Sequence, residues 1–250
     1  MFQGKKEMRN ELENFFENEL IKVQKESQLN LIEIFKAFPI ISERQGVASF
    51  ISRYELFKKI INVQGSIIIC GVYTGFDLFS FYHLSSILEP VNHQRRIYGF
   101  DTFEGFKGIS KNDKTADSSK HMYEGGQKAG VYNFLKKLIE VHDNNRFLKH
   151  IKKVELVKGN FLETCDPFLK NNPHLICSML YLDFDLYKPT LHALKKFYNL
   201  MPKGGVIVFD QLNLSQWPGE SMAVKEFFKN NQISIKRFSW DSVLSYTIKE

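Results

Sequence analysis

The chain has 250 residues, of which 43% are hydrophobic and 25% are charged. This composition excludes a disordered or fibrous protein and is sufficient for one core of substantial size. The formal net charge is +6, but the lysines are scattered rather than grouped with aromatic residues, so the sequence does not favour a nucleic-acid partner.

The start of the chain and its cysteines predict a cytoplasmic protein. We expect no membrane association, because no apolar stretch resembles a secretory signal or is long enough to span a bilayer. The three cysteines, Cys70, Cys165 and Cys177, are odd in number and have no C-x-x-C spacing. A disulfide framework or a zinc site is therefore not expected, and a reducing compartment fits this usage.

Helical periodicity is typical of the N-terminal region. Apolar residues such as Leu12, Phe16 and Leu20 recur at helical spacing and predict a helix over residues 7–38, which Pro39 ends. A second helix is expected through residues 50–57. We interpret residues 1–60 as an N-terminal helical extension and residues 61–250 as the main domain.

Strand and helix patterns alternate through the main domain. Short apolar runs predict buried strands at residues 66–70, 96–100, 154–157, 177–182 and 205–209. Helices are expected between and after them, at residues 76–88, 131–141, 190–200 and 221–230. The tail alternates over residues 233–238 and 242–248, as paired strands do. This order predicts an α/β fold with a doubly wound, mainly parallel sheet.

A polar, glycine-rich stretch over residues 105–130 interrupts this pattern. A loop of this length inside a compact domain is usually functional. We expect it to cover the substrate, and to be mobile until ligands bind. It contains His121, the one histidine that we consider for substrate contact or for a catalytic base.

Glycine or acidic residues follow nearly every predicted strand, and in doubly wound sheets ligands bind beyond the carboxyl ends of strands. Gly71 and Gly75 flank the turn after the first strand, where the backbone can approach a ligand closely. Asp101 ends the second strand, where its carboxylate could accept two ribose hydroxyls; the alternative is an N-cap for the next segment. The turn lacks the G-x-G-x-x-G fingerprint, which disfavours a nicotinamide dehydrogenase.

Three longer signatures point to one family. Residues 98–106 read YGFDTFEGF, residues 182–187 read LDFDLY, and residues 202–220 run from PKGG through FDQLN to WPGE. Together with RYELF at residues 53–57, they resemble the macrocin O-methyltransferase family, over roughly residues 50–228. The resemblance implies a class I methyltransferase fold of the Rossmann-like type, S-adenosylmethionine as cofactor, a divalent metal and a sugar hydroxyl as acceptor.

The resemblance also implies a metal site. It places metal-ligating carboxylates at Asp183 and Asp210, which end the fourth and fifth strands. Gln211 stands where many members carry a second acidic residue, so the third protein ligand is Gln211 or Glu220. Two carboxylates on adjacent strand ends repel each other unless a cation or a proton lies between them. Oxygen ligands suit Mg²⁺, or Mn²⁺, better than zinc.

The resemblance extends to the cofactor and the chemistry. It implies that S-adenosylmethionine contacts the turns after the strands, at Gly71, Val72, Gly75, Asp101, Thr102, Phe103, Asn160, Phe161 and Asp183. Ile69 and Asn160 depart from the family pattern, since acidic residues are frequent at both positions. Asp183 and His121 are the candidate catalytic residues.

The expected function is transfer of a methyl group from S-adenosylmethionine to a hydroxyl of a sugar or a similar polyhydroxylated small molecule, with Mg²⁺ assistance. An RNA methyltransferase, suggested by the basic charge, and a catalytically silent cofactor-binding protein, suggested by the departures, remain alternatives. Asp183 and Asp185 could instead only cap the turn before Thr190. We interpret Asp185 as a structural residue or as one that orients Asp183, and contact with the substrate is the alternative. The protein could form a homo-oligomer.

Overall fold

The computed structural model describes residues 11–27, 29–229 and 233–250. The chain divides into two compact units, residues 1–51 and residues 52–250. Within the described residues, no helix is both long enough and apolar enough to cross a membrane.

The first unit contains α2 (Glu11–Glu26), α3 (Leu31–Lys36), α4 (Phe38–Ile41) and the start of α5 (Arg44–Ile60). The prediction of one helix over residues 7–38 is wrong in its described part, and residues 7–10 lie outside that part. Asn30 begins a new helix, because its side chain accepts hydrogen bonds from the Ile32 and Glu33 backbone N–H groups. Pro39 does not end a helix either; it occupies the first turn of α4, where a missing N–H is harmless.

The second unit is built on a seven-stranded sheet in the order β3-β2-β1-β4-β5-β7-β6. Its strands are β1 (Ser66–Cys70), β2 (Ile97–Asp101), β3 (Val154–Lys158), β4 (Cys177–Leu182), β5 (Val206–Phe209), β6 (Lys236–Arg237) and β7 (Ser245–Ile248). The first five are parallel, and β7 pairs antiparallel with both β5 and β6. The predicted α/β fold with a doubly wound, mainly parallel sheet is confirmed.

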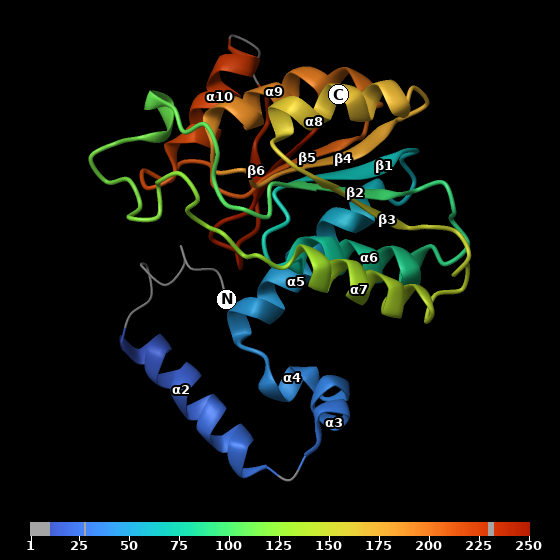
Figure 1. The fold of residues 1–250 in the computed structure, drawn as a ribbon, viewed down its shortest axis with the longest axis vertical. Coiled ribbons are helices and arrows are strands. Elements are labelled where there is room, and N and C mark those ends of the chain that lie inside the picture. The colour runs from blue at the N-terminus through green and yellow to red at the C-terminus, as the bar shows by residue number, and fades with distance from the viewer. Residues whose placement is uncertain (1–10, 28, 230–232) are drawn as a thin grey trace. The chain divides into compact units, whose positions relative to one another are not determined.

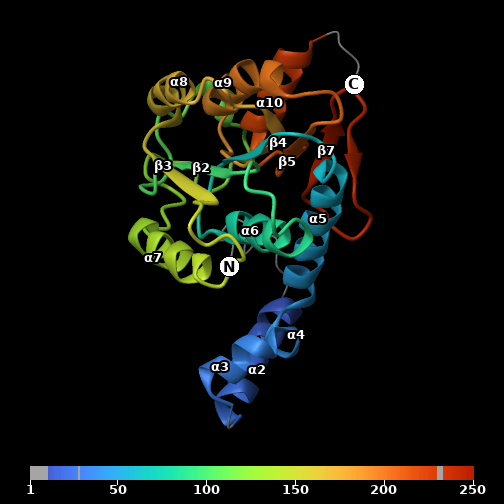
Figure 2. The same cartoon turned by 90° about the vertical axis from the view of Figure 1, so that its right-hand side faces the viewer.

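Helices cover both faces of this sheet. α6 (Phe76–Leu88) and α7 (Tyr132–Asp143) lie on one face, and α8 (Phe161–Asn171), α9 (Tyr187–Phe197) and α10 (Pro218–Phe228) lie on the other (Figures 1 and 2). Single 3₁₀ turns occur at Lys111–Asp113 and Tyr198–Leu200. The central strands β1, β4 and β5 are buried along their whole length, which explains their mainly apolar sequences.

The predicted elements of this unit match the observed ones closely in the sheet and less closely at the tail. The helix over residues 76–88 is found with the predicted bounds, and α7, α9 and α10 begin within a few residues of prediction. Of the strand expected over residues 233–238, only Lys236–Arg237 is paired, and both residues are exposed. The alternating pattern was therefore a weak signal there.

The strand registers bring the functional turns to one edge of the sheet. Cys70 pairs with both Phe100 and Leu182, and Leu182 pairs with Phe209. The residues that follow these four are Gly71, Asp101, Asp183 and Asp210. They consequently lie in a row across the carboxyl ends of β2, β1, β4 and β5, where such sheets bind ligands.

Candidate active site

The turn after β1 packs directly on the turn after β4. The Asp183 backbone N–H donates to the Cys70 carbonyl at 2.7 Å. Gly71 has a φ of +102°, and a Cβ added there would lie 2.0 Å from the Asp183 carbonyl oxygen. Only glycine fits both the backbone conformation and this close approach. The sequence signal at Gly71 therefore has a steric reason.

Asp101 ties the turn after β1 to the turn after β2. Its Oδ2 accepts the N–H groups of Val72 and Tyr73, each at 2.8 Å, and its Oδ1 accepts the N–H of Phe103 at 2.6 Å. Burial raises the pKa of Asp101, while these three hydrogen bonds act in the opposite direction. The side chain therefore shapes the turn itself, in addition to any contact with a ligand.

The other predicted cofactor residues have clear structural tasks. Thr102 closes the next turn, because its hydroxyl donates to the Gly105 carbonyl. Phe103 is buried and packs on the Tyr132 ring. Asn160 caps α8 by accepting the Leu162 N–H. The remaining two are Gly75, which begins α6 with a φ of +96°, and Phe161, which belongs to the main apolar core.

Four carboxyl groups gather beyond β4 and β5. Burial raises the pKa of Asp183, and the charges of Asp210 and Asp185 raise it further. Burial and then the charge of Asp210 raise the pKa of Asp185 in the same way. The Glu220 pKa is raised mainly by burial, and its side chain is fully buried at the start of α10. The cluster therefore holds more negative charge than its surroundings favour, a condition that a proton or a cation relieves.

Unpaired oxygens in this cluster fit a hard cation. Asp185 Oδ1, Gln211 Oε1 and Glu220 Oε2 are buried and have no hydrogen-bond partner among the described residues. The other Glu220 oxygen accepts the Gln211 N–H at 3.0 Å, which joins the two candidates for the third ligand. Carboxylate and amide oxygens are the donors that Mg²⁺ and Mn²⁺ prefer, so the residues present fit such an ion.

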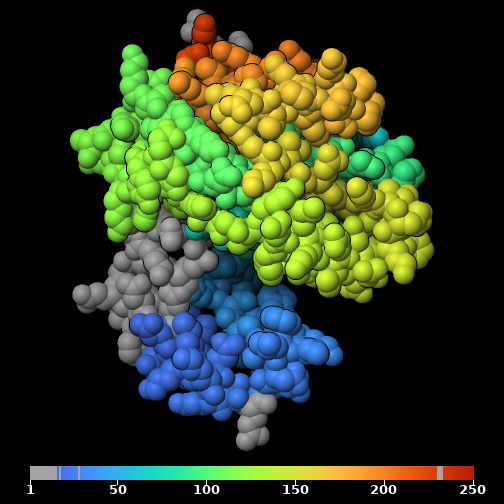
Figure 3. Space-filling view, viewed as in Figure 1, coloured from blue at the N-terminus to red at the C-terminus, as the bar shows by residue number. Residues whose placement is uncertain are grey.

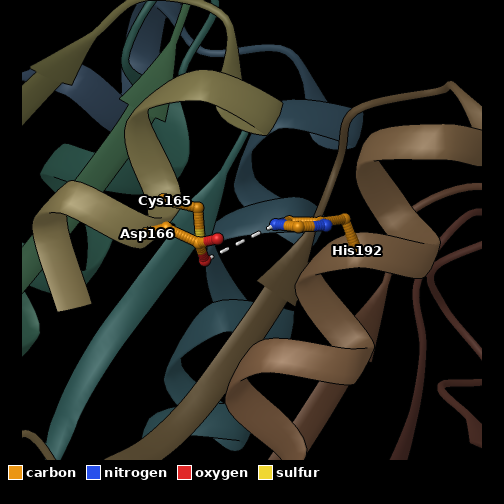
Figure 4. Close-up of side chains that lie close together, drawn as sticks. All are labelled: Cys165, Asp166 and His192. Carbon is orange, nitrogen blue, oxygen red and sulfur yellow. Dashed lines mark ion pairs between the residues drawn. The ribbon is translucent and has the colours of Figure 1, made fainter. Parts of the chain in front are cut away.

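A different group of side chains comes closest to a metal-binding spacing. Cys165 and Asp166 of α8 and His192 of α9 have ligand atoms within 4.8 Å of one another (Figure 4). Among the described residues, no three of the acidic groups beyond β4 and β5 have ligand atoms this close together. Lys196 already pairs with Asp166 at 2.6 Å, and burial raises the pKa of the Cys165 thiol to about 12. A protonated thiol and an adjacent ammonium group both oppose cation binding, so we assign no site there.

The loop over residues 105–130 is folded against the same edge. Phe106 and Met122 of the loop form a small apolar cluster with Leu186 and Trp217. The buried Asp113 carboxylate accepts the Tyr187 N–H at 2.5 Å and so caps α9. In Figure 3 the loop, in green, forms a contiguous surface of the second unit.

His121 is half-buried in this loop. Its backbone N–H donates to Ser119 Oγ, and a Cβ added at Gly126 would lie 2.1 Å from the His121 carbonyl. The Ser119 N–H in turn donates to the Gln216 carbonyl, which ties this part of the loop to the segment after β5. A role for His121 in catalysis stays a prediction.

Sequence reasoning missed Arg53 and Tyr181. Both are 1% exposed or less, and Arg53 is among the largest fully buried side chains. In the sequence, Arg53 belongs to the RYELF segment and Tyr181 to an apolar strand, and neither pattern indicates a site residue. The available signal for a buried Arg53 was the apolar pair Leu56 and Phe57 that closely follows it. Its hydrogen-bond partners, Asp77 and Tyr181, are distant in sequence, so the pattern could not reveal them.

Two solved structures superpose on almost the whole of this chain. A crystal structure of CalS11, a calicheamicin methyltransferase, superposes with a TM-score of 0.90 at 28% identity, covering 96% of this chain and 93% of that one. The apo structure of CalS11, described as a TDP-rhamnose 3'-O-methyltransferase, gives a TM-score of 0.83 at 26% identity, covering 96% and 95%.

A more distant structure shares the fold. The O-methyltransferase NovP is 20% identical, with a TM-score of 0.63 and coverage of 81% of this chain and 80% of that one. No curated protein matches the sequence significantly. Residues 55–246 match the macrocin O-methyltransferase (TylF) family, which is well over half of the chain. The chain therefore belongs to the macrocin O-methyltransferase family and is an O-methyltransferase.

Proposed function

We propose that this enzyme transfers a methyl group from S-adenosylmethionine to a sugar hydroxyl, with a divalent cation, Mg²⁺ or Mn²⁺, at the acidic cluster. The observation that carries the proposal is the row of turns at one sheet edge, which brings Gly71, Asp183 and Asp210 together. The nearby Asp185 and Glu220 each have a buried oxygen without a hydrogen-bond partner among the described residues. The similarity to CalS11, described as a TDP-rhamnose methyltransferase, supports a nucleotide-linked deoxysugar as the acceptor.

The cofactor would lie over the turns after β1 and β2. Contacts with Asp183 and Asp101 fix the turn at Gly71 and Val72, and the cofactor would lie against this turn. Asp101 keeps one of its oxygens, Oδ1, with a single backbone donor, so that oxygen can accept a ribose hydroxyl as well. Thr102, Phe103, Asn160 and Phe161 would shape this part of the site through the turns and packing that they already maintain.

The cation would be held by Asp183 and Asp210, with Gln211 or Glu220 as the third protein ligand. A bound divalent cation lowers the pKa of a coordinated hydroxyl. The chain's own residues would then orient the acceptor, and Asp183 or His121 would take its proton. The loop over residues 105–130, together with Trp217, would exclude water from the reacting groups.

An acceptor screen tests the proposal. Purified enzyme, S-adenosylmethionine and Mg²⁺ are incubated with nucleoside-diphosphate sugars, free glycosides and RNA, and products are analysed by mass spectrometry. The proposal requires one added methyl group on a sugar and none on RNA. Methylation of RNA alone would support the RNA methyltransferase instead. Cofactor binding by calorimetry, without methylation of any sugar, would support a silent binding protein.

We further propose that the protein is cytoplasmic and forms a homo-oligomer. The oligomeric state can be measured by light scattering on the same preparation.

A further inference from the structure

A buried arginine connects α5 to the site. Arg53 Nε donates to Asp77 Oδ1 of α6 at 2.6 Å, and Arg53 Nη2 donates to the Tyr181 hydroxyl of β4 at 2.7 Å. The guanidinium also lies 5.3 Å from the centre of the Phe76 ring. An arginine in this position costs free energy unless its donors are satisfied, so these contacts must form together.

The same group reaches one of the candidate metal ligands. The Tyr181 hydroxyl donates to Asp210 Oδ1 at 3.4 Å, and Arg53 Nη2 lies 3.8 Å from that oxygen. The hydroxyl thus accepts from the arginine and donates to the carboxylate. Asp210 Oδ1 is approached from the α5 side by a hydrogen bond and by a positive charge.

The positive charge of Arg53 can be neutralised without the contacts to Tyr181 and Asp210. Asp77 already forms a close ion pair with it, and Asp241 lies 3.6 Å from its Nη1 atom. The contact with Tyr181 adds a directional link to the turn that carries Asp210. Hydrogen bonds of this kind, made to a ligating carboxylate by groups behind it, commonly change metal affinity by about 10–100-fold.

We propose that Arg53 and Tyr181 are positioning residues that hold the Asp210 carboxylate by its Oδ1 atom and thereby set the affinity of the site for its divalent cation. This inference rests on the proposed function, because it requires that Asp210 bind a metal. It assigns a task to the arginine of the RYELF segment, which lies on α5, outside the sheet that carries the candidate ligands.

Mn²⁺ titration monitored by electron paramagnetic resonance tests it without any acceptor. Tyr181→Phe removes only the hydroxyl, and its matched control is Tyr98→Phe, a buried tyrosine of β2 that packs on Phe168. We expect the Mn²⁺ dissociation constant to rise about 10-fold or more in Tyr181→Phe and to stay unchanged in Tyr98→Phe. Arg53→Lys, which keeps the charge but loses the planar fork, is expected to weaken Mn²⁺ binding as well.

Affinity for S-adenosylmethionine separates positioning from general damage. It should be unchanged in Tyr181→Phe, and saturating Mg²⁺ should restore kcat while the Mg²⁺ concentration for half-maximal activity stays high. Wild-type Mn²⁺ affinity in Tyr181→Phe and Arg53→Lys, with binding lost in Asp210→Ala, would overturn this inference alone. Equal weakening in Tyr98→Phe would overturn it too. Absence of Mn²⁺ binding to the wild-type enzyme would overturn both this inference and the metal of the proposed function.

Discussion

At the residue scale, the carboxylates at the strand ends differ in how many hydrogen bonds they accept. Asp101 is committed to three backbone donors, whereas Asp185 and Glu220 each retain an oxygen without a partner in the described part of the chain. Strand ends predicted Asp101, Asp183 and Asp210 as site residues, and the family resemblance assigned the metal to Asp183 and Asp210. Strand position alone could not distinguish them by task, since backbone hydrogen bonds and side-chain burial depend on how the turns pack together.

Asp101→Ala should weaken S-adenosylmethionine binding. It removes a charged acceptor that can bind the ribose and that fixes the Val72 and Phe103 backbone. The expected loss of binding free energy is about 1.5–3 kcal/mol, together with a lower melting temperature. Calorimetry on the folded variant measures the first and a thermal melt the second. Unchanged affinity would show that Asp101 does not contact the cofactor.

Asp185→Asn should impair turnover less than Asp183→Asn. Asp185 has a φ of +61°, a conformation that asparagine also tolerates, so the substitution changes charge without straining the turn. If Asp185 only orients Asp183, the side-chain amide of the Asp185→Asn variant can still form a hydrogen bond. Steady-state rates at saturating Mg²⁺ make the comparison. A deeper loss in Asp185→Asn would identify Asp185 as the residue in contact with the acceptor.

At the element scale, the loop over residues 105–130 is attached to the rest of the unit by two contacts: Asp113 caps α9, and Phe106 packs on Trp217. That the loop is mobile until ligands bind stays a prediction from its polar, glycine-rich sequence. The partners in these two contacts lie about 70 to 110 positions away in the sequence. Local patterns cannot reveal such contacts. They did reveal α6 and the buried strands, whose periodicity is local.

Asp113→Asn should loosen this loop selectively. The buried carboxylate accepts the Tyr187 N–H with one oxygen and Ser110 with the other, and an amide can replace only one acceptor. We expect a loss of about 1–3 kcal/mol of local stability and faster hydrogen exchange in residues 105–126. Asp117→Asn, at an exposed position of the same loop, is the control. Equal exchange in the two variants would refute the anchoring role.

At the scale of the whole molecule, the acidic cluster opposes folding when no cation is bound. The pKa values of Asp183, Asp185 and Glu220 are all raised by burial in the folded protein. Above their ordinary values of 3.8 and 4.5, the folded protein therefore binds more protons than the unfolded chain. The contribution of these groups to the free energy of unfolding falls as pH rises from those values toward the raised ones.

This linkage predicts a pH effect that one substitution reduces. In EDTA, we compare the melting temperatures of Asp183→Asn and the wild type. The difference, variant minus wild type, should increase between pH 5 and pH 8, because the variant lacks one of the groups that must ionise. Mg²⁺ should raise the wild-type melting temperature most at the higher pH, since metal binding requires the ionised carboxylates. Thermal melts in matched buffers test both statements. A difference that shrinks as pH rises would contradict them.

The most direct test of the account is methyl transfer with and without the cation. Enzyme freed of metal by EDTA is given labelled S-adenosylmethionine and the acceptor found by the screen, and Mg²⁺ is then restored. We predict transfer that stops with EDTA, returns with Mg²⁺, and stays low in Asp183→Asn and Asp210→Asn. Cofactor affinity should remain close to wild type in Asp210→Asn. Full activity of Asp183→Asn in EDTA would contradict the metal mechanism and leave transfer by proximity alone.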